Sequence, residues 1–307
     1  MVTTQDSFDR LETARELRRQ ASEFRKSGLY GRMRAADACL GNPYQARSAT
    51  AHLFDGSTLQ VDVTETVGRN LFLFGAFEED LTAFVLSYLK PGMIFADIGA
   101  HVGYFSKIAA NCVGSSGHVH AFEPTPATFM RLSTNLGPLG NATCHRIALW
   151  STARELVLND YGAANSAYNS WTRPRSNDDM PVQATHTVAA RPVDAVFPDS
   201  GAAPALIKID VESAELEVLR GMERTLTEAR PIVTIEVGDI EAQNPNVPTS
   251  RAILRHVVDR GYRLFTSRQG RLEPHDLMGC GAYGYDNVIC VPEGHPMASD
   301  GAARAVC

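Results

Sequence analysis

The stretch from Met93 to Pro124 constrains the fold more than any other part of this chain. It opens with a short apolar run, of the length of a buried strand, that leads directly into Asp97. Gly99 and Gly103 follow, at positions where the backbone can turn with a positive φ and a ligand can come close. Apolar residues at helical spacing then cover Tyr104–Val113, and a second apolar run follows. This order predicts a strand, a helix and a second, parallel strand.

Acidic residues stand at the tips of both predicted strands, Asp97 after the first and Glu123 after the second. A carboxylate at the second tip can accept hydrogen bonds from both hydroxyls of a ribose. The dinucleotide fingerprint G-x-G-x-x-G is absent, because His101 stands where its second glycine would be. The pattern therefore favours a nucleoside cofactor without a pyrophosphate over a nicotinamide dinucleotide. The alternative is a buried βαβ unit whose glycines only make a turn.

Composition and patterning place most of the 307 residues in one large α/β domain. We expect residues 1–49 to form an N-terminal helical extension and residues 50–307 the main domain, with a β-hairpin at 50–63. The net charge of −6 and the 44% hydrophobic content indicate a globular, cytoplasmic protein without a nucleic-acid partner. No apolar run is long enough to span a bilayer, so no membrane partner is expected. The helix predicted at Asp6–Ser27 either packs on the core or serves as a lid or a homodimer contact.

A long polar segment at residues 160–181 is expected to be an insertion loop. Loops of this length inside a compact domain are usually functional or disordered. Tyr161, Tyr168 and Trp171 lie in this loop, and aromatic side chains among small polar residues suit a wall that faces the substrate. The alternative is a mobile surface loop.

Strands and helices alternate from residue 93 to residue 260, which predicts a mostly parallel sheet with helices on both faces. Such sheets bind ligands beyond the carboxyl ends of their strands. Asp210 and Glu236 are acids at two further strand ends, and we expect all four acidic tips to converge on one site. Lys208 alternates onto the same strand face as Asp210, which predicts a Lys–Asp pair. In the alternative interpretation, Lys208 and Asp210 only neutralise each other's charge.

Carboxylates and histidines near these tips are candidate proton acceptors, since a hydroxyl is a poor nucleophile until a base removes its proton. The candidate catalytic residues are Asp210, Glu212, Glu236 and Lys208. His101 and His275 are further candidates because an imidazole titrates near neutrality, and His275 is placed on the substrate side. The six cysteines are scattered without a C-x-x-C pair, which predicts no metal centre. Carboxylates at the site nevertheless have the oxygen chemistry that Mg²⁺ takes.

Four motifs lie in order at Phe74–Glu78, Asp97–Ser106, Ala121–Pro124 and Leu206–Gly221. Together they resemble the FkbM family of S-adenosylmethionine-dependent methyltransferases. The most distinctive part is the run Lys-x-Asp-x-Glu-x-x-Glu, which starts at Lys208. The motifs occupy the part of the chain between the predicted hairpin and the final strand.

The resemblance implies a Rossmann-like class I methyltransferase fold, with a seven-stranded, mostly parallel sheet whose last strand is antiparallel. It implies S-adenosyl-L-methionine as the cofactor, S-adenosyl-L-homocysteine as its product, and a small-molecule hydroxylated acceptor such as a sugar, macrolide or other natural product. The cofactor-binding residues implied by position are Glu78, Asp97, Gly99, Ala100, His101, Gly103, Tyr104, Glu123, Pro124, Ala148 and Asp210. Glu78 would lie near the amino-acid end of the cofactor, Ala148 against the adenine, and Asp210 beside the methyl group.

Two positions depart from the pattern of the family, and two other functions stay open. His101 stands where the family commonly has Asn, and Ser213 stands where it commonly has Gly. An amine acceptor would make the protein an N-methyltransferase, since an amine needs less help from a base. A module that binds the cofactor without turnover would carry the same motifs.

Overall fold

The computed structural model of the chain describes residues 4–25, 48–172, 180–198, 203–239, 247–268, 271–277 and 283–299. Outside these ranges lie residues 26–47 of the expected extension, residues 173–179 of the expected loop, and Cys39, Cys280 and Cys307. The described cysteines, Cys112, Cys144 and Cys290, are free thiols.

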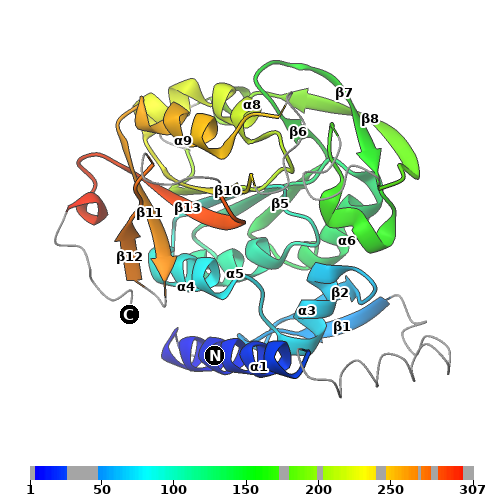
Figure 1. Ribbon diagram of the computed structural model, residues 1–307. Helices are drawn as coiled ribbons and strands as arrows, with labels where there is room; N and C mark the ends of the chain where they lie inside the picture. Colours follow the sequence, from blue (N-terminus) through cyan, green and yellow to red (C-terminus); the bar gives the residue numbers. More distant parts are fainter. Residues whose placement is uncertain are drawn as a thin grey trace.

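An eight-stranded sheet forms the centre of the molecule (Figure 1). Its strands are β3 (Ile94–Ile98), β4 (His118–Phe122), β5 (Ala142–His145), β9 (Leu206–Ile209), β10 (Ile232–Val237), β11 (Tyr262–Arg268), β12 (Arg271–Pro274) and β13 (Asp286–Pro292). They are arranged in the order β12-β11-β13-β10-β9-β3-β4-β5. The expected α/β fold with a mostly parallel sheet is confirmed, and β12 adds an eighth strand to the seven that were expected.

The order in which the chain adds strands to the sheet reverses at the border between β3 and β9. From β3 the chain moves outward through β4 to β5, and it then returns to β9 on the other side of β3. The last strand, β13, is antiparallel between β10 and β11, as expected. The border of β3 and β9 is therefore a topological switch point, where open α/β sheets bind their ligands.

Helices cover both faces of this sheet (Figure 1). One face carries α8 (Glu215–Arg220) and α9 (Ser250–Val258), and the other carries α4 (Glu79–Tyr88) and α5 (Tyr104–Val113), while α6 (Pro126–Leu136) packs next to β5. The apolar spacing seen in the sequence is explained by burial, since α5 buries Phe105 and Ile108. None of the described helices is long and apolar enough to cross a membrane.

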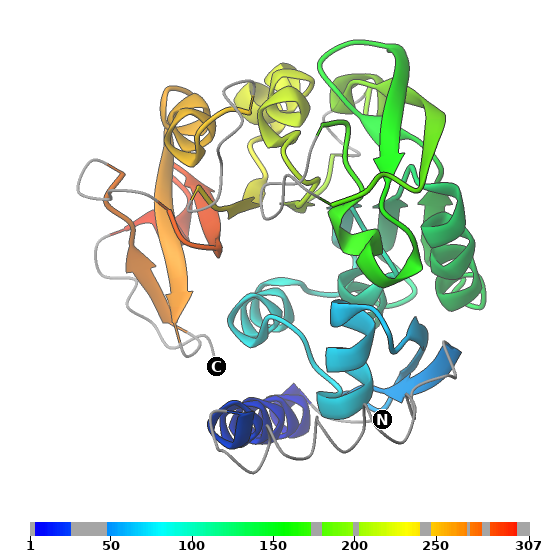
Figure 2. The ribbon, with the colours of Figure 1, turned by 45° about the vertical axis from the view of Figure 1, so that its right-hand side comes forward.

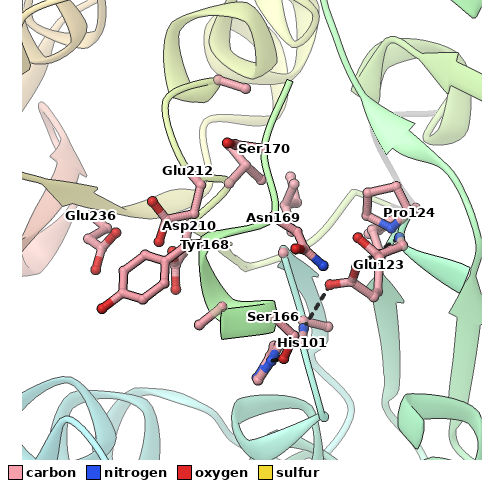
Figure 3. A pocket seen from close by; sticks show the side chains of 18 of the residues that line it. His101, Glu123, Pro124, Ser166, Tyr168, Asn169, Ser170, Asp210, Glu212 and Glu236 are labelled. Carbon is pink, nitrogen blue, oxygen red and sulfur yellow. Dashed lines mark hydrogen bonds between the residues drawn. The ribbon is translucent and has the colours of Figure 1, made fainter. Parts of the chain in front are cut away.

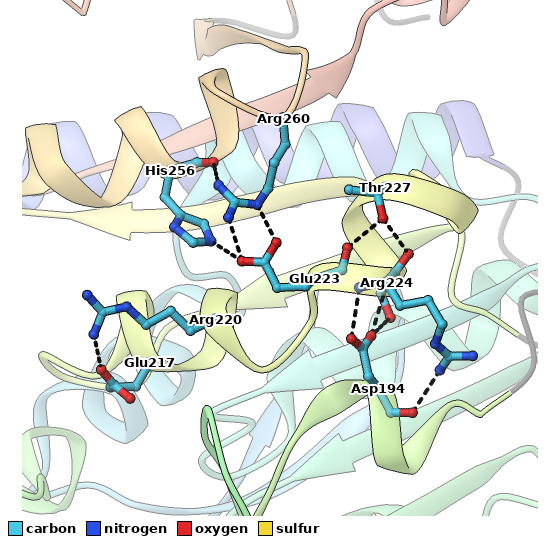
Figure 4. A network of polar contacts seen from close by, with 9 residues as sticks. Asp194, Glu217, Arg220, Glu223, Arg224, Thr227, His256 and Arg260 are labelled. Carbon is cyan, nitrogen blue, oxygen red and sulfur yellow. Dashed lines mark hydrogen bonds and ion pairs between the residues drawn. The ribbon is translucent and has the colours of Figure 1, made fainter.

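A polar network holds α9 to the chain that follows α8 (Figure 4). The Glu223 carboxylate accepts hydrogen bonds from Arg260, from Nε at 2.7 Å and from Nη2 at 2.5 Å. Asp194, in the short helix α7 (Val193–Val196), accepts from the backbone N–H groups of Arg224 at 2.8 Å and Thr225 at 2.9 Å. Charge-assisted bonds of this kind position the helical layer over one face of the sheet.

The expected hairpin is formed by β1 (Ser48–His52) and β2 (Thr58–Asp62), which pair in antiparallel register. A helix that the sequence did not predict, α3 (Thr66–Phe74), follows directly. Glu65 caps this helix, because its side chain accepts hydrogen bonds from the backbone N–H groups of Val67 and Gly68. Gly75 ends it with a φ of +68°.

The N-terminal helix α1 (Thr4–Arg25) packs against α3 and α4. Two ion pairs fix it there, Arg15 with Asp80 at 2.8 Å and Arg18 with Glu79 at 2.6 Å. The apolar residues of α1 are only partly buried, since Leu11 is buried whereas 48% of Leu17 is exposed. A homodimer through this helix stays a prediction.

A small second sheet lies over the end of the main one. It consists of β6 (Ala148–Leu149), β7 (Arg154–Asp160) and β8 (Ala184–Arg191) in the order β6-β8-β7. Residues 142–149 are divided between the two sheets, with β5 in the main sheet and β6 in the small one. The loop after β7 contains a short 3₁₀ helix, η1 (Ala163–Tyr168), which lies next to α3 (Figure 2).

Three histidines form a row across β4 and β5. The ring of His120 lies 4.8 Å from that of His118 and 5.4 Å from that of His145, measured between centroids. A hydrogen bond of 3.1 Å joins Nδ1 of His120 to Nε2 of His145. Burial and the neighbouring imidazoles lower the pKa of His120 to about 4.

This row is expected to make the fold less stable in mild acid. Between pH 6.5 and 4 the unfolded state binds a proton at His120 that the folded state excludes, so stability is present above pH 6.5 and is lost as the pH falls through 4. We expect this residue to contribute about 1–2 kcal/mol, because the ring is partly open to solvent. Denaturant unfolding at pH 7.5 and pH 5 should show that the free energy of unfolding falls less between these pH values for His120→Gln than for the wild type. The exposed His52→Gln serves as the control, and equal losses in all three proteins would contradict the assignment.

Candidate active site

Three of the four acidic strand tips, Glu123, Asp210 and Glu236, meet at one cavity of about 390 Å³ at the carboxyl ends of the central strands. The predicted site residues that line it are Glu78, Gly99, Ala100, His101, Tyr104, Glu123, Pro124, Ala148, Tyr168, Trp171, Lys208, Asp210, Glu212 and Glu236. They come from the ends of β3, β4, β9 and β10, from the start of α4, from β6 and from the insertion loop. The structure thus brings most of the predicted residues together in one place.

Asp97 and Gly103 support this cavity from beneath and are not among the residues that line it. Asp97 is 1% exposed and accepts a hydrogen bond from the Ser106 hydroxyl at 2.7 Å. A Cβ atom at Gly103 would lie 2.8 Å from Cδ1 of Leu132, so this glycine lets α5 begin close to α6. Both residues therefore hold the turn between β3 and α5 in place.

Gly99 makes the closest approach between the two turns at the switch point. Its φ is +80°, and a Cβ atom there would lie 1.7 Å from the carbonyl oxygen of Asp210. The turns after β3 and β9 therefore touch through their backbones, and a side chain between them would push them apart. The two turns thus form one backbone floor of the cavity, which Gly99 and Asp210 both line.

Glu123 points its carboxylate into the cavity from the tip of β4 (Figure 3). It accepts hydrogen bonds from the backbone N–H groups of Thr125 at 2.9 Å and His101 at 3.2 Å. Burial raises the pKa of Glu123 to about 7, although these donors favour the charged form. The apolar residues Ile147, Ala148 and Leu149 line the same cavity. A polar acceptor next to apolar walls fits a ribose joined to a flat base.

Lys208 is a buried cation shared by two carboxylates. Its Nζ lies 2.9 Å from Asp210 and 3.8 Å from Asp97, and it sits 5.3 Å from the centre of the Phe105 ring. Burial alone would lower the pKa of Lys208, but the carboxylates of Asp210 and Asp97 raise it above its usual value. A lysine that keeps its proton cannot serve as the base, so its contribution is to orient Asp210.

Carboxylates gather at the other end of the cavity, where Asp210, Glu212 and Glu236 lie near the ring of Tyr168 (Figure 3). Burial, followed by repulsion from Asp210, raises the pKa of Glu236 well above its ordinary value. The same two causes raise the pKa of Glu78 to about 7. The cavity therefore has a nucleoside-like half around Glu123 and a strongly acidic half around Asp210.

The insertion loop closes over the cavity. Trp171 donates a hydrogen bond from Nε1 to the carbonyl of Ser213 at 3.1 Å, and its ring meets that of Trp150 edge-on at 5.3 Å. His101 and Ser166 are 3.0 Å apart between Nε2 and Oγ, which connects η1 to the turn after β3. The position where the family commonly has Asn thus contacts the loop in this protein.

Two residues predicted to face the substrate lie elsewhere. Tyr161 is 1% exposed and donates a hydrogen bond from its hydroxyl to the carbonyl of Thr172 at 3.1 Å. His275 lies 2.8 Å from the Tyr283 hydroxyl, measured from Nε2. Neither is among the residues that line the cavity. The prediction for these two is therefore corrected, because one fills the space under the loop and the other pairs near the end of β12.

Other lining residues were not predicted from the sequence. Thr66 and Val67 come from the start of α3, and Tyr285 comes from the segment before β13. In α3 a continuous apolar run at residues 71–74 hides which side of the helix is buried, so its contribution to the cavity could not be inferred. Tyr285 follows a glycine-rich segment and had no motif to mark it.

A family model and a curated relative match the sequence of this chain. The family model described as the Methyltransferase FkbM domain matches residues 97–264. The hexuronic acid methyltransferase AglP of Haloferax volcanii is 28% identical over 166 residues, which are 52% of this chain and 63% of AglP. The chain therefore matches somewhat less than two thirds of that curated relative.

Two solved structures resemble the chain in fold. The methyltransferase FkbM from Methylobacillus flagellatus KT is 16% identical with a TM-score of 0.41, over 65% of this chain and 43% of that one. Fibrillarin from Aeropyrum pernix, solved with natively bound S-adenosyl-L-methionine, is 11% identical with a TM-score of 0.39, over 80% of this chain and 94% of that one. Neither likeness adds to the assignment at these TM-scores. Because the family model covers more than half of the 307 residues, the chain belongs to the FkbM methyltransferase family, as its motifs had indicated.

Proposed function

We propose that this protein transfers a methyl group from S-adenosylmethionine to a hydroxyl of a small molecule, and that the acceptor is a sugar or a related natural product. The observation that carries the proposal is that Glu123 and Asp210, from opposite sides of the switch point, open into one cavity. The similarity to a hexuronic acid methyltransferase supports a sugar-like acceptor.

The residues present fit the cofactor. Gly99 allows the turns after β3 and β9 to touch, which a Cβ atom would prevent, and Glu123 offers carboxylate oxygens for ribose hydroxyls. Ala148 lies on the side suited to the adenine, and Glu78 on the side suited to the methionine ammonium group. When bound, S-adenosylmethionine supplies an electrophilic methyl group whose bond to sulfur breaks with the electron pair remaining on sulfur.

The chain itself orients the acceptor and removes a proton. Asp210 accepts the proton of the hydroxyl as its oxygen forms the bond to the methyl carbon, which removes the positive charge from the new ether. Lys208 donates to Asp210 at 2.9 Å and fixes the direction of its carboxylate. Tyr168 and Trp171 cover the site and limit the access of water.

Calorimetry with S-adenosylmethionine and S-adenosylhomocysteine tests the cofactor. Binding of neither compound at high concentration would reject the proposal. A panel of hydroxylated and amine acceptors, followed by release of S-adenosylhomocysteine, tests turnover. Release with amines alone would favour N-methylation, and tight cofactor binding without release would favour a binding module.

Replacing Glu123 should weaken cofactor binding. We expect Glu123→Ala to lower the affinity for S-adenosylhomocysteine by about 1–3 kcal/mol, because charged hydrogen bonds are lost. Since burial raises the pKa of Glu123 to about 7, its charged form is lost as the pH falls from 8 to 6. Wild-type affinity should therefore fall over this range more than that of Glu123→Gln. Parallel pH profiles for the two proteins would count against a ribose-binding role.

A further inference from the structure

We propose that Asp210, Glu212 and Glu236 form a binding site for one divalent cation in the acidic half of the cavity. The sequence predicted no metal centre, and none of these side chains belongs to a metal-binding sequence motif. The site itself is argued from geometry and charge, while its part in methyl transfer rests on the proposed function.

The oxygen atoms are spaced for a single ion. One carboxylate oxygen from each of the three residues lies within 4.8 Å of the others. Oxygen ligands stand about 2.0–2.1 Å from Mg²⁺ and about 2.3–2.6 Å from Ca²⁺, so two ligands of one ion are at most about 4–5 Å apart. The cluster therefore needs only small side-chain movements to enclose an ion.

The backbone explains why these three side chains meet. Strands β9 and β10 are parallel neighbours, and Ile209 pairs with Ile235. Asp210 and Glu236 each follow that pair by one residue, so they stand side by side at the carboxyl ends of adjacent strands. Glu212 follows in the turn with a φ of +47°, which brings the chain back toward the same point.

Glu78 adds a second observation, from outside the cluster, that this end of the cavity lacks positive charge. It enters the cavity from a different part of the chain, at the start of α4, and lines the cavity together with Glu236. Its Oε2 atom is shielded from solvent and has no hydrogen-bond partner among the described residues. A buried carboxylate oxygen without a donor costs free energy that a nearby cation would offset.

The positive charge available from the chain is small. Lys208 is the only lysine or arginine among the described residues that line this cavity, and two carboxylates already share it. Arg268 lines the adjoining hollow of about 230 Å³ but forms an ion pair with Asp286. Among the described residues the acidic half thus has more carboxylates than cations, and this stays true when the ammonium group of the proposed cofactor is counted beside Glu78.

An ion at this point has a clear use. The hollow beside it is large enough to admit part of an acceptor and shares Glu78, Glu236 and Tyr285 with the main cavity. A hydroxyl bound to a divalent cation loses its proton more readily. A carboxylate oxygen of the cluster that is not bound to the ion can accept this proton.

Titration with Mn²⁺ alone tests the site without using activity. The full chain is stripped with a chelator, and the loss of the free Mn²⁺ signal in electron paramagnetic resonance is followed as protein is added. We expect one saturable site in the wild type and an affinity lower by about tenfold or more in Glu236→Gln and in Glu212→Gln. Asp80→Asn, which removes a carboxylate from the adjoining hollow, is the matched control and should bind within about twofold of the wild type.

Two outcomes overturn the proposal: no saturable Mn²⁺ binding to the wild type, or wild-type affinity in both glutamine variants. If the variants fail to fold, the wild type still decides, because a bound ion should raise its melting temperature relative to the chelated protein. Binding of S-adenosylhomocysteine, measured on the same samples, separates the two proposals. Cofactor binding without Mn²⁺ binding rejects the metal site alone, and the reverse rejects the cofactor assignment alone.

Discussion

The variant Asp210→Asn is expected to transfer methyl groups about 10²–10⁴-fold more slowly than the wild type, while its affinity for S-adenosylhomocysteine changes little. Asparagine keeps the shape of the side chain and can still accept a hydrogen bond from Lys208, which lies 2.9 Å from Asp210. It cannot take a proton from an acceptor, and it is a weaker ligand for a cation. Both routes of hydroxyl activation therefore fail together.

Separate measurement of turnover and binding makes this result specific. Steady-state release of S-adenosylhomocysteine gives the rate, and calorimetry gives the cofactor affinity. Glu155→Gln, which removes an exposed carboxylate on β7, should match the wild type in both. A parallel loss of affinity and rate in Asp210→Asn would instead show that Asp210 acts mainly in cofactor binding.

The slow turnover of Asp210→Asn has two possible causes, loss of a metal ligand and loss of a base, and a chelator separates them. If a divalent cation activates the hydroxyl, a chelator should slow the wild type but should change the rate of Asp210→Asn much less. If Asp210 is only a base, the chelator should change neither protein. The ratio of the two chelator effects therefore distinguishes the two roles.

The convergence of acids could be read from the sequence because it follows from the parallel sheet. Asp97, Glu123, Asp210 and Glu236 come at the ends of apolar runs, and the carboxyl ends of parallel strands share one edge. The Lys208–Asp210 pair could also be predicted from the sequence, because residues two apart on a strand share a face. The contact of Lys208 with Asp97 could not, since it depends on β3 and β9 being neighbours across more than a hundred residues.

The other features that were not predicted depend on packing between residues far apart in the sequence, which local sequence patterns do not encode. In α3 Leu71 is buried, but the adjacent Phe72 and Leu73 are about half exposed, with values of 48% and 50%, so the continuous apolar run does not mark the buried side of the helix. Only residues 146 and 147 separate β5 from β6, yet the two strands join different sheets. Tyr161 and Tyr168 lie in the same loop with similar neighbours in sequence, and only the packing under the loop separates a core residue from one that lines the cavity.

The substitution Gly99→Ala is expected to damage both the fold and the cofactor site. A Cβ atom at this position would lie 1.7 Å from the carbonyl oxygen of Asp210 and 3.3 Å from Cγ1 of Val211, and the φ of +80° is unfavourable for alanine. The two turns must separate, which should cost about 2–4 kcal/mol of folding free energy. For a chain of this size we expect the melting temperature to fall by about 5–10 °C.

The same separation should lower the affinity for S-adenosylhomocysteine by more than about tenfold, because Gly99 and Asp210 line the cavity from these two turns. Gly140→Ala is the matched control, since no atom of the described residues lies within 4 Å of the added carbon there. Thermal unfolding and calorimetry on both variants measure the two effects. If Gly99→Ala melted and bound like Gly140→Ala, the backbones of the two turns could not be in contact, and a common floor beneath Glu123 and Asp210 would have to be abandoned.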